Sequence, residues 1–308
     1  MDISRSAARQ LTSICHPGPA GGTILPGLVD AHVHLQLIDP YALTAGGIAA
    51  VDDLGGAPAA LQRLTRESDD DRLPVIRYAA AFLTAPGGYP SDRAWAPLGS
   101  WREIRSVDDA GHAVAEQLEA GAALIKVTLN STAGPTLSPP QLHAVIDAAH
   151  TAGHAVVAHV EDHPGEHTML ALALESGVDR LAHTPWTTPA GPALLRTAAA
   201  QDMIWISTLA IHQGEARRTA IANLRGFLDA GGQVRYGTDL GNGLQPLGVN
   251  PAEVRALQSA GMSVDDVLRA LTTHDLPADP PPCLIPEGLD RDPARFSHSL
   301  ATAQVMRA

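Results

Sequence analysis

Short apolar segments alternate with longer amphipathic segments along most of the chain. Eight apolar runs are predicted strands, at 24–33, 48–53, 75–82, 122–128, 155–160, 179–183, 203–208 and 233–238. The clearest amphipathic helices are predicted between them, at 106–121, 138–153 and 215–232. The helix over 138–153 has Ser138 as its N-cap, prolines at its first positions, and Gly153 just past its end.

This alternation predicts parallel strands joined by right-handed helical crossovers, and eight such units close a barrel. A doubly wound open sheet is the alternative. The barrel is favoured because no glycine-rich phosphate loop follows the first strand. Polar residues also lie at the ends of many strands instead of at one switch point. We therefore expect an α/β fold of the (β/α)8 TIM-barrel type.

The chain has 308 residues, of which 45% are hydrophobic, so it can build one large core. Its formal net charge of -12, with no cluster of Lys or Arg, argues against nucleic acid or an anionic membrane as a partner. No apolar stretch approaches the roughly 20 residues that span a bilayer. The N-terminus lacks the apolar region of a secretory signal, and we expect a cytoplasmic protein. Cys15 and Cys283 are too few for a disulfide framework.

Three segments are expected along the chain. Residues 1–23 form an N-terminal extension, 24–275 the barrel, and the Pro- and Asp-rich segment 276–308 a wrap over the barrel. Within the barrel, the irregular stretch 83–105 is too long for an ordinary connection and carries Tyr89, Trp95 and Trp101. It is either a functional lid or an aromatic cluster that covers the barrel rim.

Six residues stand at strand ends with side chains suited to metal binding: His32, His34, Lys126, His159, His183 and Asp239. His32 and His34 are two positions apart, so on a strand both point to the same side and can reach one ion. His159 and His183 each close another apolar run, where a core histidine is the alternative reading. Asp239 in YGTDLG fits a metal-binding carboxylate, with a helix N-cap as the alternative.

Lys126 lies in the apolar strand ALIKV, where an ammonium group is costly to bury. Burial is expected to lower its pKa. A neutral lysine amine can add carbon dioxide to give a carbamate, an anionic oxygen donor that can bridge two cations. The competing explanation is that Lys126 pairs with a neighbouring Asp or Glu.

The motifs PGLVDAHVHL, GAALIKV, AGHAVVAHV, VDRLAHTPW and YGTDLG, in this order, resemble the amidohydrolase superfamily. The resemblance is to its imidazolonepropionase-like or prolidase-like hydrolases and runs from about Ile24 to about Leu271. It implies that His32, His34 and Asp239 hold one divalent ion and that His159 and His183 hold a second. Carboxylated Lys126 and a hydroxide would bridge the two ions, which are expected to be Zn, with Mn, Fe or Co also compatible with these ligands.

The chain departs from that family's pattern in two ways. The β-sandwich that usually flanks the barrel is expected to be missing or vestigial, because few residues precede the first strand and the C-terminal segment lacks the usual closing motif. Deaminases of the superfamily also carry a proton-shuttling Glu shortly after the equivalent of His159. Here Glu161 is out of place for that role and Asp162 is the wrong residue.

These features predict a binuclear metal-dependent hydrolase that cleaves an amide, peptide-like or cyclic amide bond of a small molecule. Asp239 is expected to act as general base and to pass the proton to the leaving group. His212 is expected to contact a substrate carboxylate or the developing oxyanion, or else to lie on the rim. His163, Trp186 and Asn242 are weaker candidates for substrate contact. The alternatives are a mononuclear deaminase and a catalytically inactive barrel that serves as a binding scaffold, and a homo-oligomer stays open.

Overall fold

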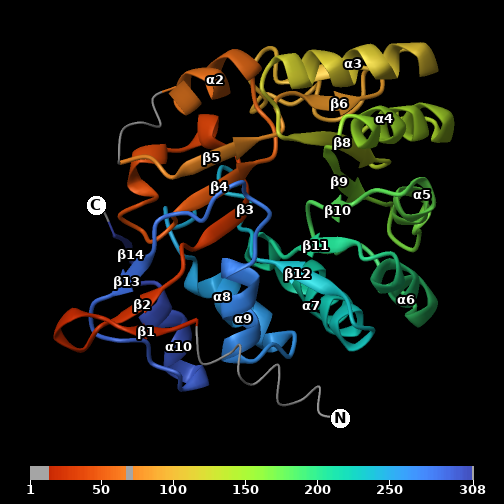
Figure 1. Ribbon diagram of the computed structural model, residues 1–308. Coiled ribbons are helices and arrows are strands. Elements are labelled where there is room, and N and C mark those ends of the chain that lie inside the picture. Colours follow the sequence, from red (N-terminus) through yellow and green to blue (C-terminus); the bar gives the residue numbers. More distant parts are fainter. Residues whose placement is uncertain (1–13, 67–71, 307–308) are drawn as a thin grey trace, which may run out of the picture.

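The computed structural model describes residues 14–66 and 72–306, which form a mixed α/β fold with three sheets (Figure 1). The largest sheet is parallel and has seven strands, in the order β12 (Gln233–Arg235), β11 (Ile204–Ile206), β10 (Arg180–Leu181), β9 (Ala155–Glu161), β8 (Leu124–Asn130), β6 (Phe82–Thr84) and β7 (Trp101–Glu103). The second, also parallel, contains β3 (Val29–Val33), β4 (Ala50–Asp53) and β5 (Val75–Tyr78).

Backbone hydrogen bonds join the two parallel sheets at both ends of the smaller one. On one side, Ala123 N–H, just before β8, donates to the carbonyl of Tyr78 at the end of β5, at 2.9 Å. On the other side, Asp239 N–H, after β12, donates to the carbonyl of His32 on β3, at 2.8 Å. A parallel bridge between Val33 and Leu240 lies beside it. The carboxyl ends of β3 and β12 therefore lie side by side.

The helices lie outside the parallel strands (Figure 1). They are α2 (Pro58–Arg66), α3 (Val107–Glu119), α4 (Pro139–Thr151), α5 (Thr168–Ser176), α6 (Pro192–Ala200), α7 (Gly214–Asp229), α8 (Pro251–Ser259), α9 (Val264–Thr272) and α10 (Pro293–Leu300). The three helices predicted most clearly are confirmed as α3, α4 and α7. Ser138 is the N-cap of α4, and Gly153 follows its end with φ 80°.

The core lies between the parallel strands and these helices. Its buried side chains are mostly Ala, Val, Leu and Ile, as the low aromatic content of the chain requires. The largest of the buried aromatic side chains is Trp205 of β11, whose ring stacks on that of Phe227 of α7 at a centroid distance of 4.0 Å. This packing fixes α7 against the strand that leads to Ser207 and Thr208.

The third sheet is small and joins the two terminal segments. Its antiparallel strands, in the order β1 (His16–Pro17), β2 (Thr23–Leu25), β13 (Cys283–Ile285) and β14 (Gln304–Val305), are two or three residues long. The C-terminal segment thus pairs with β2, which spans the predicted boundary between the N-terminal extension and the barrel. Residues 1–13 of that extension lie outside the described residues.

Two predicted strands are wrong as continuous elements. The run 24–33 is divided at Pro26 and Gly27, so that β2 joins the terminal sheet and β3 the parallel one. The run 75–82 is divided into β5 and β6 near Ala80, which has φ 56°. An apolar run indicates burial but not the strand with which it pairs, and for this reason the pattern missed both breaks. The stretch 83–105, taken as irregular, contains most of β6 and all of β7.

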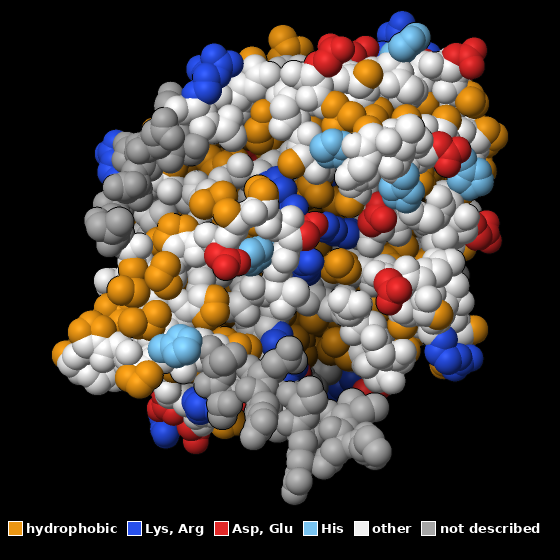
Figure 2. Space-filling model, viewed as in Figure 1, with side chains coloured by type: hydrophobic (Ala, Val, Ile, Leu, Met, Phe, Trp, Pro, Cys, Tyr) orange, Lys and Arg blue, Asp and Glu red, His pale blue; other side chains and the backbone are white. Residues whose placement is uncertain are grey.

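On the face that Figure 2 shows, acidic and basic side chains are interspersed. Among the described residues, no helix is both long enough and apolar enough to cross a membrane.

Candidate active site

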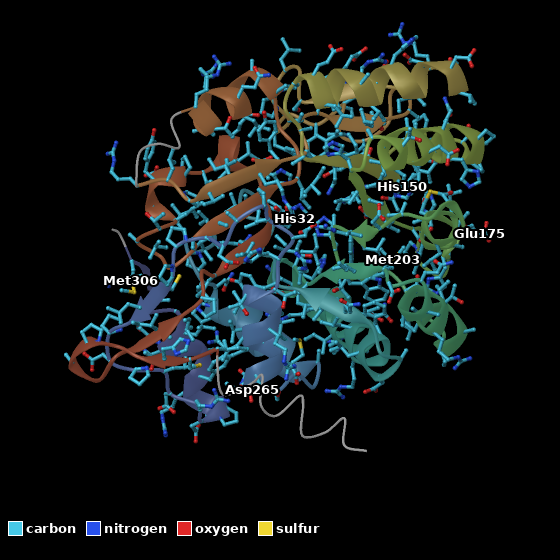
Figure 3. The ribbon with its side chains drawn as sticks, viewed as in Figure 1. His32, His150, Glu175, Met203, Asp265 and Met306 are labelled. Carbon is cyan, nitrogen blue, oxygen red and sulfur yellow. The ribbon has the colours of Figure 1, made fainter. Side chains whose placement is uncertain are left out.

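All six residues singled out at the strand ends line one cavity of about 250 Å³. His32 lies near the middle of the molecule, on β3 (Figure 3), and His34 follows that strand. The other four come from separate strands: Lys126 lies in the first half of β8, His159 lies in the second half of β9, His183 follows β10, and Asp239 follows β12. Parallel strands end on the same side of a sheet, and this topology gathers residues that are far apart in the sequence.

His32 and His34 present the same ring atom to the cavity. Nδ1 of His32 lies 2.7 Å from the carbonyl oxygen of Ala182, and Nδ1 of His34 lies 2.9 Å from that of Gly55. Since a carbonyl only accepts, both Nδ1 atoms carry the proton. In the neutral ring the lone pair is therefore on Nε2, and the two Nε2 atoms lie 3.3 Å apart. Backbone acceptors behind the rings fix the orientation that a metal-binding histidine needs.

Asp239 adds a carboxylate oxygen to these two ring nitrogens. Its Oδ1 lies 3.1 Å from Nε2 of His32 and 3.3 Å from Nε2 of His34. Asn242 Nδ2 donates to the other carboxylate oxygen at 2.9 Å. Although burial alone would raise the pKa of Asp239, the neighbouring histidines hold it well below its usual range, so the group is a carboxylate. Two imidazole nitrogens and an anionic oxygen at these separations suit a divalent cation.

His183 extends this group towards His159. His32, His183 and Asp239 each offer one atom that could bind a metal ion, and these three atoms lie within 4.8 Å of one another. The ring of His159 is 5.0 Å from that of His183, centroid to centroid. Burial lowers the pKa of His32, His159 and His183, which keeps these rings neutral and their lone pairs available.

His34 behaves differently. Burial would lower its pKa, but its hydrogen bond and attraction to Asp239 outweigh burial and raise it. A divalent cation between the two groups would compete with that proton, because the same lone pair serves both.

Lys126 is buried in the same cavity wall. Burial lowers the pKa of its amine to about 7, and the attraction of Asp239 and Asp53 offsets only part of this effect. The carboxylate of Asp53 already accepts two backbone hydrogen bonds, from the N–H groups of Leu35 at 2.7 Å and Gly55 at 2.9 Å. A substantial fraction of the Lys126 side chain is therefore the neutral amine at neutral pH.

Aromatic side chains form the other walls. The ring of Trp186 stacks on that of His212 at a centroid distance of 4.7 Å, and Tyr89 stacks on His159 at 5.0 Å. Nε2 of His212 is buried with no hydrogen-bond partner among the described residues. Burial lowers the pKa of His212 to about 4, so this ring is neutral. Trp95 also lines the cavity, which brings two of the three aromatics of the 83–105 stretch to the site.

Two of the three weaker candidates for substrate contact reach the cavity, and one does not. Trp186 and Asn242 line the cavity, whereas His163 is exposed and is not part of its wall. Glu161, which the sequence analysis set aside, does line it. A signal for Glu161 was present, because it lies two positions after His159 on one strand, and such residues face the same side.

The model of the amidohydrolase family matches residues 23–275. The chain belongs to the amidohydrolase family. Membership identifies it as a metal-dependent hydrolase that acts on carbon–nitrogen bonds of the amide type.

Other proteins share parts of its sequence or its fold. An uncharacterised protein of Mycobacterium bovis is 29% identical over 280 residues, covering 81% of this chain and 72% of the relative. A solved Xaa-Pro dipeptidase with bound methionine has a TM-score of 0.71 at 17% identity, covering 91% of this chain and 84% of its own. The ochratoxinase of A. niger has a TM-score of 0.70 at 17% identity, covering 90% and 80%.

Proposed function

We propose that this amidohydrolase is a binuclear enzyme that cleaves an amide, peptide-like or cyclic amide bond of a small molecule. The observation that carries the proposal is the convergence of His32 Nε2, His34 Nε2 and Asp239 Oδ1, with both Nδ1 atoms occupied by backbone carbonyls. His159 and His183 supply a second pair of neutral imidazoles beside it. Lys126, as a carbamate, is the proposed bridge between the two halves of the site.

The residues present fit a pair of divalent cations, with Zn the best match to neutral imidazole and carboxylate donors. When bound, such ions lower the pKa of a water molecule and polarise the amide carbonyl. Asp239 would take the proton of that water and deliver it to the leaving nitrogen, since its carboxylate is kept ionised and faces the centre of the cavity. Asn242 would hold the second carboxylate oxygen and thus the orientation of this base.

His212 would contribute a neutral ring N–H to the oxyanion that develops on the carbonyl. Its unpartnered Nε2 in the cavity wall supports this role, and stacking on Trp186 fixes the plane of its ring. Trp186, Tyr89 and Trp95 would exclude water from the substrate by covering it with aromatic surface.

We also infer that eight strands of the two parallel sheets, β3, β4, β5 and β8 to β12, form one (β/α)8 barrel, with residues 24–275 as its domain. The hydrogen bonds from Ala123 to Tyr78 and from Asp239 to His32 support this closure.

Metal stoichiometry and activity together test the proposal. Metal-free protein reconstituted with Zn²⁺ should bind close to two equivalents of metal per chain, measured by plasma emission spectrometry. The reconstituted protein should also cleave members of a panel of N-acyl amino acid amides and dipeptides. A chelator should abolish the cleavage, and Asp239→Asn should reduce it strongly with the fold intact. Asp147→Asn, at an exposed position of α4, is the matched control. Full activity without metal would contradict the proposal. One equivalent of bound metal together with release of ammonia would favour the deaminase alternative.

A further inference from the structure

The turn that follows β11 begins with a residue whose side chain does not cap it. This turn is the short 3-10 helix η5 (Leu209–Ile211), and Thr208 is its N-cap residue. A threonine at an N-cap usually has extended backbone and accepts a hydrogen bond from an N–H group of the first turn. Thr208 has left-handed backbone, with φ 43°, and its hydroxyl accepts no such bond. The hydroxyl lies instead 2.8 Å from Nδ1 of His183.

A distant side chain supplies the missing cap. The N–H groups of Leu209 and Ala210 donate to the two carboxyl oxygens of Glu253, at 3.0 and 2.6 Å. Glu253 belongs to α8, 44 positions after Leu209, and is fully buried. The first N–H groups of a helix have no acceptor within it, so both oxygens of Glu253 satisfy a need that Thr208 leaves open.

A carboxyl group is costly to bury. Burial raises the pKa of Glu253 to about 7, which reflects that cost. Both oxygens are nevertheless spent on one turn, and this turn begins directly after the residue that contacts His183. The arrangement points to a role in the candidate site.

The helix that carries Glu253 is tied to the strands at its first turn. Asn250 is the N-cap of α8, and its side chain accepts from the N–H group of Ala252 at 2.9 Å. The N–H group of Asn250 donates to the hydroxyl of Tyr236 at 2.8 Å. Tyr236 is fully buried and directly follows β12, the strand that leads to Asp239. Glu253 is therefore held at a fixed position beside the candidate ligands.

The effect on His183 follows from competition for one hydroxyl. When Nδ1 of His183 donates to Thr208, the lone pair of the neutral ring is on Nε2, the atom left for a metal ion. Without Glu253, the N–H groups of Leu209 and Ala210 would lose their acceptors, which is costly inside a protein. The hydroxyl of Thr208 is the acceptor that an N-cap position offers them. If it turned to them, it would leave His183.

We propose that Glu253 is a positioning residue of the site. It caps η5 in place of Thr208, and this leaves the Thr208 hydroxyl free to hold the ring of His183 in its metal-binding orientation. The inference rests on the proposed metal-dependent function, to which it adds a residue that contacts neither the metal nor the substrate.

A double-mutant cycle tests the proposal in the full chain at pH 8, where the carboxylate form of Glu253 predominates. Competition with a fluorescent chelator measures the affinity for Zn²⁺ of the parent, Glu253→Gln, Thr208→Ala and the double variant. Glutamine offers one acceptor oxygen in place of two, so Glu253→Gln should weaken Zn²⁺ binding about tenfold, as loss of a partner that orients a metal-binding histidine does. In the Thr208→Ala background the same change should matter less than about twofold, because the residue through which Glu253 acts is gone.

Glu215→Gln, at an exposed position in the first turn of α7, is the matched control and should bind Zn²⁺ as the parent does. Thermal midpoints are measured for every variant. A general loss of stability would weaken binding equally in both backgrounds, and equal effects overturn the inference. Unchanged Zn²⁺ affinity of Glu253→Gln overturns it too. If Glu253→Gln does not fold, Glu253→Asp, which keeps two oxygens on a shorter side chain, takes its place and the same comparison decides.

A second readout needs neither metal nor hydrolysis. In metal-free protein labelled with ¹⁵N-histidine, the Nδ1 proton of His183, assigned with His183→Asn, should exchange with water faster in Glu253→Gln and in Thr208→Ala than in the parent. An exchange rate that Glu253→Gln leaves unchanged overturns the inference while the hydrolase proposal stands. Coupled effects without cleavage of any amide would support the inference and count against the hydrolase proposal. If the parent bound no Zn²⁺, the metal-dependent function would be contradicted and proton exchange alone would decide the inference.

Discussion

Nδ1 of His183 lies 2.8 Å from Oγ1 of Thr208, a residue whose backbone adopts φ 43°. That left-handed conformation is unusual for a β-branched residue, and here it turns the chain after β11 so that the hydroxyl reaches the back of the histidine ring. The turn is held by Glu253, whose buried carboxylate accepts from the backbone N–H groups of Leu209 at 3.0 Å and Ala210 at 2.6 Å. The orientation of a proposed metal ligand thus depends on residues outside the cavity.

Thr208→Ala should weaken metal binding. Without the hydroxyl, His183 loses the partner that fixes its ring, and partners of this kind are worth about 10- to 100-fold in metal affinity or activity. Competition with a fluorescent chelator measures the affinity, and Thr208→Ser, which keeps the hydroxyl, should bind metal nearly as the parent does. If Thr208→Ala and Thr208→Ser bound metal equally well, the hydroxyl would have no role in positioning His183.

Lys126→Ala should remove the proposed bridge between the two cations. We expect the second equivalent of metal to be lost first and hydrolysis to be abolished, because the carbamate would be a ligand of both cations. Metal content by emission spectrometry and turnover are the measurements. A short carboxylic acid in the buffer should restore part of the activity by occupying the vacated volume. A Lys126→Ala variant with two metals and full activity would show that the amine merely fills space.

His212→Ala should reduce turnover without changing metal content. If His212 donates to the oxyanion, its removal should lower kcat by roughly 100-fold. His143→Ala, on the exposed side of α4, is the matched control and should behave as the parent does. A loss confined to KM would instead place His212 in ground-state binding of the substrate.

Asp275 links three arginines that come from three different strands. Its carboxylate pairs with Arg77 at 2.9 Å, with Arg235 at 3.1 Å, and with Arg180. Burial would raise the pKa of Asp275, but these guanidinium groups outweigh it and hold the pKa below its usual range. Asp275→Asn should therefore lower the thermal midpoint at neutral pH, by roughly 2–4 °C if about 1 kcal/mol is lost.

The pH dependence of that effect follows from the sign of the shift. A carboxyl whose pKa is depressed by folding stabilises the native state above its unfolded value of about 3.9, and this contribution is lost as pH falls towards the folded value. The difference in thermal midpoint between the parent and Asp275→Asn should be constant from pH 7 to about pH 5 and should shrink below about pH 4. Calorimetry at these pH values measures it, with Asp147→Asn as control. A difference in thermal midpoint that grows as the pH falls would contradict the depressed pKa of Asp275.

The local pattern of residues was enough to predict the alternation of strands and helices and to single out candidate metal-binding residues. The periods of apolar residues and the capping signals are local, so α3, α4 and α7 could be predicted closely. Five of the six candidate metal residues could be named because each ends or follows an apolar run, a position that parallel topology makes informative. Lys126 could be named because it lies inside such a run, where an ammonium group is costly to bury. The breaks at Pro26 and near Ala80 were missed, since strand partners are chosen by contacts between distant segments.

How these side chains face one another follows from the packing of the strands. The carbonyls of Ala182 and Gly55, which set the tautomers of His32 and His34, lie far from them in the sequence and carry no side-chain signal. Thr208, behind His183, and Asn130, beside Glu161, also lie far in the sequence from the residues that they contact. Residue types and spacing indicate which atoms can bind a cation or a substrate. Their distances and charges depend on backbone groups that meet only when the strands pack, and the orientation of the site is therefore a property of the fold.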